Sequence, residues 1–260
     1  MCAFKSPAEA ACGMLLLIDI GNSRVKWGIA EDNRIVSGES FPSDSGSLEK
    51  LLDSHWQSLA MPHLVYACNV AGAEVERTIA GWTQKQWGIS PKFVKSVAQG
   101  YGVINGYEQP EKLGVDRWAG LIALREFGDR PSCVADCGTA LTFDVLDAQG
   151  RHLGGLIAPG LALMKRVLVQ ETKGINDIGR DSQGFLGRTT AAAVKGGALG
   201  ACAGLIERSV REAAKELGCA PNLVLTGGDA ETIAVALDMP CEIIPDLVLR
   251  GLLSIARSIS

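Results

Sequence analysis

Two aspartates in this sequence occupy the same place in a repeated pattern of strand, turn and strand. Asp19 follows the aliphatic run of LLLIDIGNSRVKWGIA and stands two residues before Gly21, and Asp136 stands two residues before Gly138 in VADCGTALTFDVL. A turn of glycine and small polar residues presents several backbone N–H groups, and glycine has no β-carbon to keep a phosphate away. A carboxylate beside such a turn suits Mg²⁺ or K⁺, which prefer oxygen ligands. The pattern therefore predicts a site for phosphate groups and their accompanying cation.

The residues next to these aspartates could add hydrogen bonds and charge. Asn22, Ser23 and Thr139 carry side-chain donors. Lys26 is a positive charge able to reach a β- or γ-phosphate. One Asp-x-Gly alone is typical of an ordinary turn. Two copies, each between the first two strands of a predicted three-strand meander, favour phosphate binding instead.

The segment NGYEQPEKLGVDRWAG, residues 105–120, offers groups for a second substrate. Asp116 and Arg117 stand where a helix is predicted to begin, so one interpretation is a helix cap and a solvated surface charge. The other interpretation places both at a ligand, where Arg117 binds a carboxylate with two hydrogen bonds and Asp116 accepts the proton of an attacking hydroxyl. An aspartate near a helix N-terminus is a weak base, which phosphoryl transfer tolerates because it mainly needs an oriented nucleophile.

A further turn, LTGGDAE at residues 225–231, follows an apolar strand and precedes a predicted helix. Its two glycines could let the backbone pack against an adenine or a ribose. The alternative is an ordinary connection between a strand and a helix. The phosphate-loop pattern G-x-x-x-x-G-K-[ST] does not occur in the sequence.

These residues must be positioned by two similar halves. Hydrophobic periodicity in the first half predicts strands over 14–21, 25–31 and 34–41, followed by helix, strand, helix and strand up to residue 97. The second half begins with a helix over 116–127 and repeats the meander with strands over 133–138, 141–147 and 152–158. Two helices follow, the second over 190–217, and then strand, helix, strand and a closing helix. This alternation predicts an α/β protein.

Composition restricts the classes of partner. The chain has 260 residues, a net charge of −4 and 47% hydrophobic residues. It gives no electrostatic reason to expect nucleic acid or a membrane as partner, and no run is long enough to span a bilayer. The eight cysteines are mostly single and in apolar surroundings, which favours reduced core residues. Residues 1–13 show no signal-peptide pattern and read as an extension, so we expect a cytoplasmic protein.

From about Met14 to the C-terminus, the sequence resembles the type III pantothenate kinases. The resemblance rests on six motifs, which occur in the order D-I-G-N-S-R-V-K, N-G-Y, L-G-V-D-R-W, D-C-G-T-A-L-T-F-D, L-G-G-L-I-A-P-G and L-T-G-G-D-A. The resemblance implies duplicated actin-like, ribonuclease H-like domains, each a mixed sheet with a leading three-strand meander and flanking helices, and ATP in the cleft between them. The implied boundaries are an extension over 1–13, an N-terminal domain over 14–115 and a C-terminal domain over 116–260. The implied reaction is ATP-dependent phosphorylation of pantothenate to 4'-phosphopantothenate, the first step of coenzyme A biosynthesis.

The same resemblance implies the cofactors and the site residues. The protein would be a cytoplasmic homodimer that uses Mg²⁺ or another divalent cation together with K⁺ or NH₄⁺. Asp116 would be the catalytic proton acceptor, Asp136 would bind the monovalent cation, and Asp19 would hold the divalent cation through water. The implied ATP-binding residues are Asp19, Ile20, Gly21, Asn22, Ser23, Arg24, Val25, Lys26 and Thr139. The implied pantothenate-binding residues are Tyr107, Gly114, Val115, Asp116, Arg117 and Thr190.

Three points qualify this assignment. Ser23 replaces a frequent threonine and keeps its hydroxyl, and strand alternation predicts that Cys137 points away from the phosphates. Thr190 has a second threonine, Thr189, beside it. The small residues of GGALGACAG, 196–204, would suit close helix packing either at a dimer interface or within one subunit. The alternatives to a pantothenate kinase are another small-molecule kinase of the same superfamily and a nucleotide-binding accessory protein without catalysis.

Overall fold

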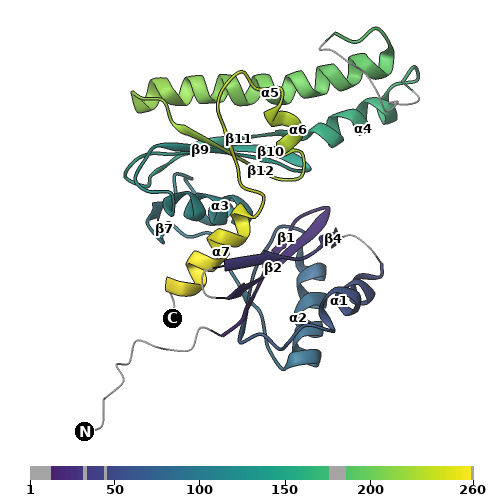
Figure 1. Ribbon diagram of the computed structural model, residues 1–260, viewed down its shortest axis with the longest axis vertical. Coiled ribbons are helices and arrows are strands. Elements are labelled where there is room, and N and C mark those ends of the chain that lie inside the picture. The colour runs from purple at the N-terminus through teal and green to yellow at the C-terminus, as the bar shows by residue number, and fades with distance from the viewer. Residues whose placement is uncertain (1–12, 32–33, 44–45, 176–185, 259–260) are drawn as a thin grey trace. The chain divides into compact units, whose positions relative to one another are not determined.

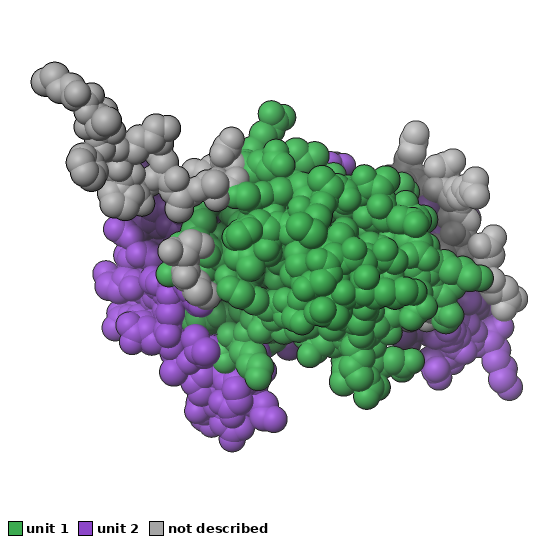
Figure 2. Space-filling view, turned by 90° about the horizontal axis from the view of Figure 1, so that it is seen from below, with its two compact units in different colours: residues 1–96, 114–119, 248–260 green, residues 97–113, 120–247 purple. Residues whose placement is uncertain are grey.

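The computed structural model describes residues 13–31, 34–43, 46–175 and 186–258. Contacts between Cα atoms divide the chain into two compact units, coloured separately in Figure 2. Unit 1 comprises residues 1–96, 114–119 and 248–260, and unit 2 comprises residues 97–113 and 120–247. The boundary expected at 115/116 follows the internal repeat and stays a prediction. The expected extension lies almost wholly outside the described residues.

Unit 1 is built on one mixed sheet with the strand order β3-β2-β1-β5-β6. The two hairpin pairs β1–β2 and β2–β3 are antiparallel, whereas β1–β5 and β5–β6 are parallel. Figure 1 shows α1 and α2 side by side against this sheet. The elements are β1 (Leu15–Ile20), β2 (Arg24–Glu31), β3 (Arg34–Ser37), β4 (Phe41–Pro42), α1 (Leu48–Trp56), β5 (Leu64–Asn69), α2 (Ala73–Trp87) and β6 (Lys92–Phe93).

The core of unit 1 lies between the sheet and these two helices. Leu16, Ile18 and Ile20, alternate residues of β1, join it because successive side chains of a strand point to opposite faces. Trp56 is completely buried and lies with its ring edge-on to Trp82, the two centroids 5.7 Å apart. Such aromatic pairs contribute about 0.5–1.5 kcal/mol beyond their buried area. The rigid sheet that results carries the residues on its other face, including Asp19.

Unit 2 is built on a second mixed sheet, with the order β11-β10-β9-β12-β13. Its elements are β7 (Gln99–Gly100), β8 (Val103–Ile104), the 3₁₀ helix η1 (Pro110–Lys112), β9 (Ser132–Cys137), β10 (Ala140–Leu146), β11 (His152–Pro159), α4 (Leu161–Glu171), α5 (Thr190–Leu217), β12 (Asn222–Thr226), α6 (Ala230–Ala234) and β13 (Glu242–Ile243). Two helices, α3 (Val115–Arg125) and α7 (Leu247–Ser258), contain residues of both units. Within unit 2, α4 and α5 contact each other and β10 (Figure 1).

The two sheets have the same construction. β9 pairs with β10 antiparallel and with β12 parallel, as β1 pairs with β2 and β5. The outer strands β11 and β13 repeat the directions of β3 and β6. The duplicated α/β architecture predicted from the two meanders is therefore confirmed.

The structure differs from the predicted elements in several places, and the strand expected to reach residue 97 is only β6, which ends at Phe93. The strand expected over 34–41 is split into β3 and β4, and Gly38 between them lies so close to the ring of Trp27 that a side chain there would overlap it. The helix predicted between the last two strands is short, since α6 ends at Ala234. The glycine-rich loop before α3 contains the unexpected hairpin β7–β8 and the 3₁₀ helix.

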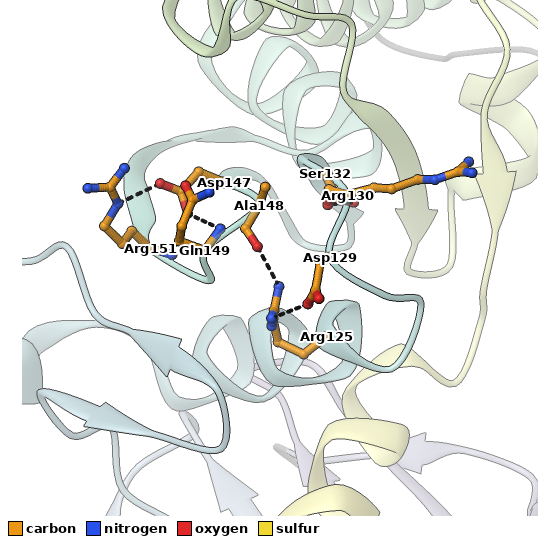
Figure 3. Close-up of polar contacts among 8 residues, drawn as sticks. All are labelled: Arg125, Asp129, Arg130, Ser132, Asp147, Ala148, Gln149 and Arg151. Carbon is orange, nitrogen blue, oxygen red and sulfur yellow. Dashed lines mark hydrogen bonds and ion pairs between the residues drawn. The ribbon is translucent and has the colours of Figure 1, made fainter.

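The last part of α3 is fastened to the turn between β10 and β11, both in unit 2 (Figure 3). The Arg125 guanidinium donates to the Ala148 carbonyl oxygen at 3.3 Å and to the Asp129 carboxylate at 2.5 Å. Inside the turn, the Asp147 carboxylate accepts from the backbone N–H of Gln149 at 2.9 Å and of Arg151 at 2.8 Å, and from Arg151 Nε at 2.6 Å. Burial alone would raise the pKa of Asp147, but these hydrogen bonds lower it below its usual value.

Candidate functional site

The turn between β1 and β2 has the tight form that the sequence predicts. The Gly21 N–H donates to the Arg24 carbonyl oxygen at 3.0 Å, which closes the hairpin, and Asn22 and Ser23 are exposed. Asp19 and Lys26 are register partners on the two strands, so they lie on the same face of the sheet. The turn therefore presents backbone groups, two short polar side chains and one ammonium group beside one carboxylate.

Three of the predicted ATP-binding residues in this hairpin are engaged elsewhere through their side chains. Ile20 and Val25 are completely buried in the core of unit 1. The Arg24 guanidinium donates to the Ser40 carbonyl oxygen at 2.6 Å and from Nε to the Ser40 hydroxyl at 2.9 Å. A role in ATP binding for these residues would therefore come from the backbone, and it stays a prediction.

Asp19 has a neighbour that the sequence did not reveal. Cys68 lies beside it on the adjacent parallel strand β5, and its Sγ donates to Asp19 Oδ1 at 3.3 Å. Burial raises the pKa of the Cys68 thiol well above its usual value, and the negative charges of Asp19 and Asp116 raise it further. The thiol therefore stays protonated and can only act as a donor to the carboxylate. The charges of both carboxylates thus act on one buried thiol, and all three residues belong to unit 1.

Asp116 stands in the first turn of α3, where the preceding glycine makes room for it. A β-carbon at Gly114 would lie only 2.6 Å from Asp116 Oδ1. That oxygen accepts the Arg117 backbone N–H at 2.8 Å. Arg117 is only 7% exposed, so its interpretation as a solvated surface charge is wrong. A part for Arg117 in ligand binding stays a prediction.

The turn between β9 and β10 in unit 2 is shorter than its counterpart. The Gly138 N–H donates to the Ala140 carbonyl oxygen at 3.2 Å, and Asp136 is the register partner of Thr142. Cys137 is buried in the core of unit 2, as predicted. Burial, together with the charge of Asp136, raises the pKa of its thiol to about 12. This cysteine is therefore chemically inert beside the turn.

Two other glycines allow neighbouring backbone segments to pack closely against this turn. Gly227, of the LTGGDAE turn, has φ +91°, and a β-carbon there would lie 2.6 Å from the Cys137 carbonyl oxygen. The Asp229 N–H donates to the same oxygen at 2.9 Å. The Gly160 N–H donates to the Thr139 carbonyl oxygen at 2.9 Å. The second Asp-x-Gly turn and the LTGGDAE turn are thus parts of one arrangement, which the sequence could not show for segments so far apart.

The predicted substrate residue Tyr107 is held by its own N-G-Y motif. The Asn105 side chain accepts the Tyr107 N–H at 3.0 Å and donates to the carbonyl oxygens of Val97 at 3.2 Å and Pro110 at 3.0 Å. The ring of Tyr107 is stacked on that of His152, with centroids 5.9 Å apart. The Asn105 side chain therefore fixes the backbone at Tyr107, and the imidazole of His152 packs against its ring.

The remaining predicted substrate residue, Thr190, begins α5. Thr189 is the N-cap of that helix, and its hydroxyl accepts the Ala192 N–H at 3.1 Å. The Thr189 hydroxyl therefore caps the helix, whereas the Thr190 side chain is exposed. A role for Thr190 in binding stays a prediction.

The donor set suits a metal ion that is held partly by phosphate. Among the described residues, no three His, Cys, Asp or Glu side chains gather as a complete metal site. Mg²⁺ commonly takes one or two protein carboxylates and completes its shell with phosphate oxygens and water. Asp19, buried at the end of β1 and oriented by Cys68, meets that requirement.

The sequence is similar to a single family over most of its length. The family model for type III pantothenate kinase matches residues 15–212. A type III pantothenate kinase from Nitrosococcus oceani is 40% identical over 253 residues, covering 95% of each chain. One from Burkholderia vietnamiensis is 40% identical over 255 residues, covering 93% of this chain and 95% of the other.

Solved structures with lower identity share the fold. A structure from Sinorhizobium meliloti named for 2-dehydro-3-deoxygalactonokinase superposes with a TM-score of 0.59 at 16% identity, covering 94% of this chain and 99% of the other. An archaeal actin homologue gives a TM-score of 0.50 at 11% identity, covering 95% and 100%. The actin-like fold class expected from the sequence is confirmed.

Proposed function

The chain belongs to the type III pantothenate kinase family, and on that basis we propose that it transfers the γ-phosphate of ATP to the primary hydroxyl of pantothenate. The product is 4'-phosphopantothenate, and the reaction is the first step of coenzyme A biosynthesis. The observation that carries the proposal is the match over nearly the whole chain, within which the motif residues Asp19, Asp116 and Asp136 are all present.

Asp116 is the proposed proton acceptor. A hydroxyl nucleophile must be held in line with the phosphorus and must lose its proton as the bond to phosphorus forms. The carboxylate of Asp116 stands at the first turn of α3, where a β-carbon at Gly114 would lie 2.6 Å from its Oδ1, so only glycine fits beside it. It would orient the hydroxyl and take its proton late in the transfer, when the oxygen has become acidic.

The hairpin of β1 and β2 is proposed to bind the phosphates of ATP. The backbone N–H groups of the Gly21–Ser23 turn would bind phosphate oxygens, and Lys26 would neutralise developing charge as a point charge. Asp19 would hold Mg²⁺, or another divalent cation, through its water shell. When bound, the cation supplies charge neutralisation between phosphate oxygens, which lowers the barrier to transfer.

The second Asp-x-Gly turn is proposed to bind a monovalent cation and part of ATP. Asp136 would hold K⁺ or NH₄⁺, and Thr139 would contact ATP. The supporting observation is the close packing of Gly227 against the Asp136 carboxylate and the Cys137 carbonyl group, because it brings a glycine-rich backbone next to the carboxylate without a side chain between them.

Pantothenate carries a carboxylate, an amide and a primary hydroxyl, and the proposed residues could bind these groups. Arg117 would bind the carboxylate with two hydrogen bonds, and the Tyr107 phenol would add a polar contact. The peptide of Gly114 and Val115 and the hydroxyl of Thr190 would complete the binding. A sugar kinase would instead need several side chains for ring hydroxyls, so the chemistry of this set favours pantothenate.

A cytoplasmic homodimer is the proposed state of the protein. β11 is an edge strand that exposes Leu156 at 46% and Ile157 at 64%, an apolar pair suited to a second copy. The free cysteines among the described residues suit a reducing compartment. No helix in the described part of the chain is long and apolar enough to cross a membrane. Sedimentation at micromolar protein would show twice the chain mass for a dimer and 27.4 kDa for a monomer.

The proposal is tested by measuring ADP release with purified protein, ATP, Mg²⁺ and K⁺. We expect ADP to form only when pantothenate is present, and not when a hexose replaces it. ADP release with the hexose alone would support the other kinase class. No release with either acceptor, in K⁺ or NH₄⁺, would support the accessory protein.

A further inference from the structure

One face of the sheet in unit 2 carries a row of polar side chains that includes a buried pair with no assigned role. Leu141 and Phe143 of β10 point into the core beneath α4 and α5. Thr142 and Asp144 therefore point to the opposite face, because side chains alternate along a strand. Asp136 lies on this same face as the register partner of Thr142. The face that bears the proposed cation ligand thus continues along β10 to Asp144.

Asp144 is joined to His152, the first residue of β11. Asp144 Oδ1 and His152 Nε2 are 2.8 Å apart, and the two side chains are 1% and 0% exposed. The register of β10 and β11 shifts between Val145 and Leu146, next to the left-handed Gly154, and such a bulge re-aims the side chains beside it. The irregularity in an otherwise regular hairpin accompanies the pairing of these two residues.

The contacts of the imidazole identify its tautomer. His152 Nδ1 is buried and has no hydrogen-bond partner among the described residues. A proton on Nδ1 would be a buried donor without an acceptor, which costs more than a lone pair in the same place. The ring proton therefore belongs on Nε2, which donates it to Asp144. This single strong hydrogen bond leaves the imidazole one orientation.

The ring of Tyr107 packs against the oriented imidazole. Their rings are stacked at an interplanar angle of 17°. The backbone of Gly106 lies directly against the His152 carbonyl, so close that a β-carbon at Gly106 would overlap it. The Ile104 N–H donates to the Gly150 carbonyl oxygen at 2.8 Å. The loop is thus docked on the start of β11 by its backbone, and Tyr107 meets His152 by its ring.

We propose that Asp144 and His152 are positioning residues for pantothenate binding: Asp144 fixes the imidazole of His152, and the imidazole fixes the ring of Tyr107. This inference rests on the proposed function, because it gives Tyr107 its substrate. A buried polar pair is often replaceable by apolar residues without loss of stability, so stability alone does not account for it. Neither residue contacts substrate, and both act through Tyr107.

The test compares His152→Gln with Tyr107→Ala and with the double variant. Glutamine keeps an N–H for Asp144, so the carboxylate stays paired, but it removes the ring beneath Tyr107. We expect His152→Gln to raise the KM for pantothenate roughly tenfold, with the KM for ATP and kcat close to wild type. The double variant should be no worse than Tyr107→Ala, since the histidine acts through the tyrosine.

Two control variants separate positioning from a general effect. His63→Gln makes the same change at an exposed histidine and should behave as wild type. Asp144→Asn keeps an oxygen to accept from Nε2, so its KM for pantothenate should stay within about threefold of wild type. Equal increases in the KM for pantothenate and ATP, or multiplied effects in the double variant, would mean a merely structural role and overturn the inference.

A second measurement keeps the inference testable whatever the substrate. The chain has three tyrosines. With isotope-labelled tyrosine rings, His152→Gln should shift one of the three ring signals, because the ring current of the imidazole is lost. If no tyrosine signal moves, His152 does not hold Tyr107 and the inference fails. If a signal moves but Tyr107→Ala leaves the KM for pantothenate unchanged, the proposed substrate role of Tyr107 fails instead.

Discussion

At the scale of single residues, the site of unit 1 is two carboxylates around one thiol. Asp19 and Asp116 come from different elements, yet both raise the pKa of Cys68. The thiol is uncharged, so it orients Asp19 without competing for a cation. In the proposed function, Asp19 would serve the divalent cation and Asp116 the nucleophile.

Asp116→Asn tests the second role. The amide has nearly the same shape and keeps the Gly114 contact, but it cannot accept the proton. We expect kcat to fall by about 10²–10⁴, with an unfolding free energy within about 1 kcal/mol of wild type. Steady-state kinetics and urea denaturation measure the two quantities. If the unfolding free energy fell so far that the unfolded fraction accounted for the lost activity, Asp116 would be a structural residue.

At the scale of elements, the strands position the aspartates, and the glycine turns leave room around their side chains. Asp19 lies near the end of β1 and Asp136 near the end of β9, and each points away from the helices that cover the core of its unit. Alternation along a strand suffices to predict this, which is why the sequence identified both residues. It also predicted that Cys137 would be buried.

The sequence could not identify residues whose role depends on register. Cys68 is one apolar-looking position in YACNV, and only its pairing beside Asp19 in the parallel sheet gives it a partner. His152 and Asp144 are eight residues apart across a bulged hairpin, and no periodic pattern encodes a bulge. The close approach of Gly227 to the Asp136 carboxylate and the Cys137 carbonyl group is likewise long-range, and glycine in a turn has several ordinary explanations.

The turn between β10 and β11 gives a prediction about stability. Asp147→Asn removes the ion pair with Arg151 and weakens hydrogen bonds from two backbone N–H groups. We expect a loss of roughly 1–3 kcal/mol at pH 7, measured by urea denaturation. Arg130→Gln, which changes a charge outside these contacts in Figure 3, is the matched control and should lose far less.

The pH dependence of this loss has a definite sign. The pKa of Asp147 is lowered in the folded protein, so its contribution is fully present above its ordinary value of about 3.9 and is lost as pH falls through the folded value. The difference in unfolding free energy between wild type and Asp147→Asn should therefore shrink as the solution is made acidic. A difference that is constant from pH 7 down to the acid transition would contradict the role of this carboxylate.

At the scale of the whole molecule, one chain contains the same sheet twice with different residues at equivalent places. The first sheet pairs Asp19 with Lys26 across its hairpin, and the second pairs Asp136 with Thr142. The first copy thereby has a positive charge for phosphates, whereas the second has an uncharged hydroxyl. We infer that duplication supplied the scaffold and that substitution in each hairpin set its task, a divalent cation and triphosphate in one and a monovalent cation in the other.

The most direct test of the account is to identify the product by mass spectrometry and ³¹P NMR after incubation with ATP, Mg²⁺, K⁺ and pantothenate. We predict one phosphate on the primary hydroxyl of pantothenate and an equal amount of ADP, formed much more slowly when Na⁺ replaces K⁺. Equal rates in the two salts would remove the monovalent cation from Asp136. ATP consumed with no phosphorylated pantothenate would contradict the central claim.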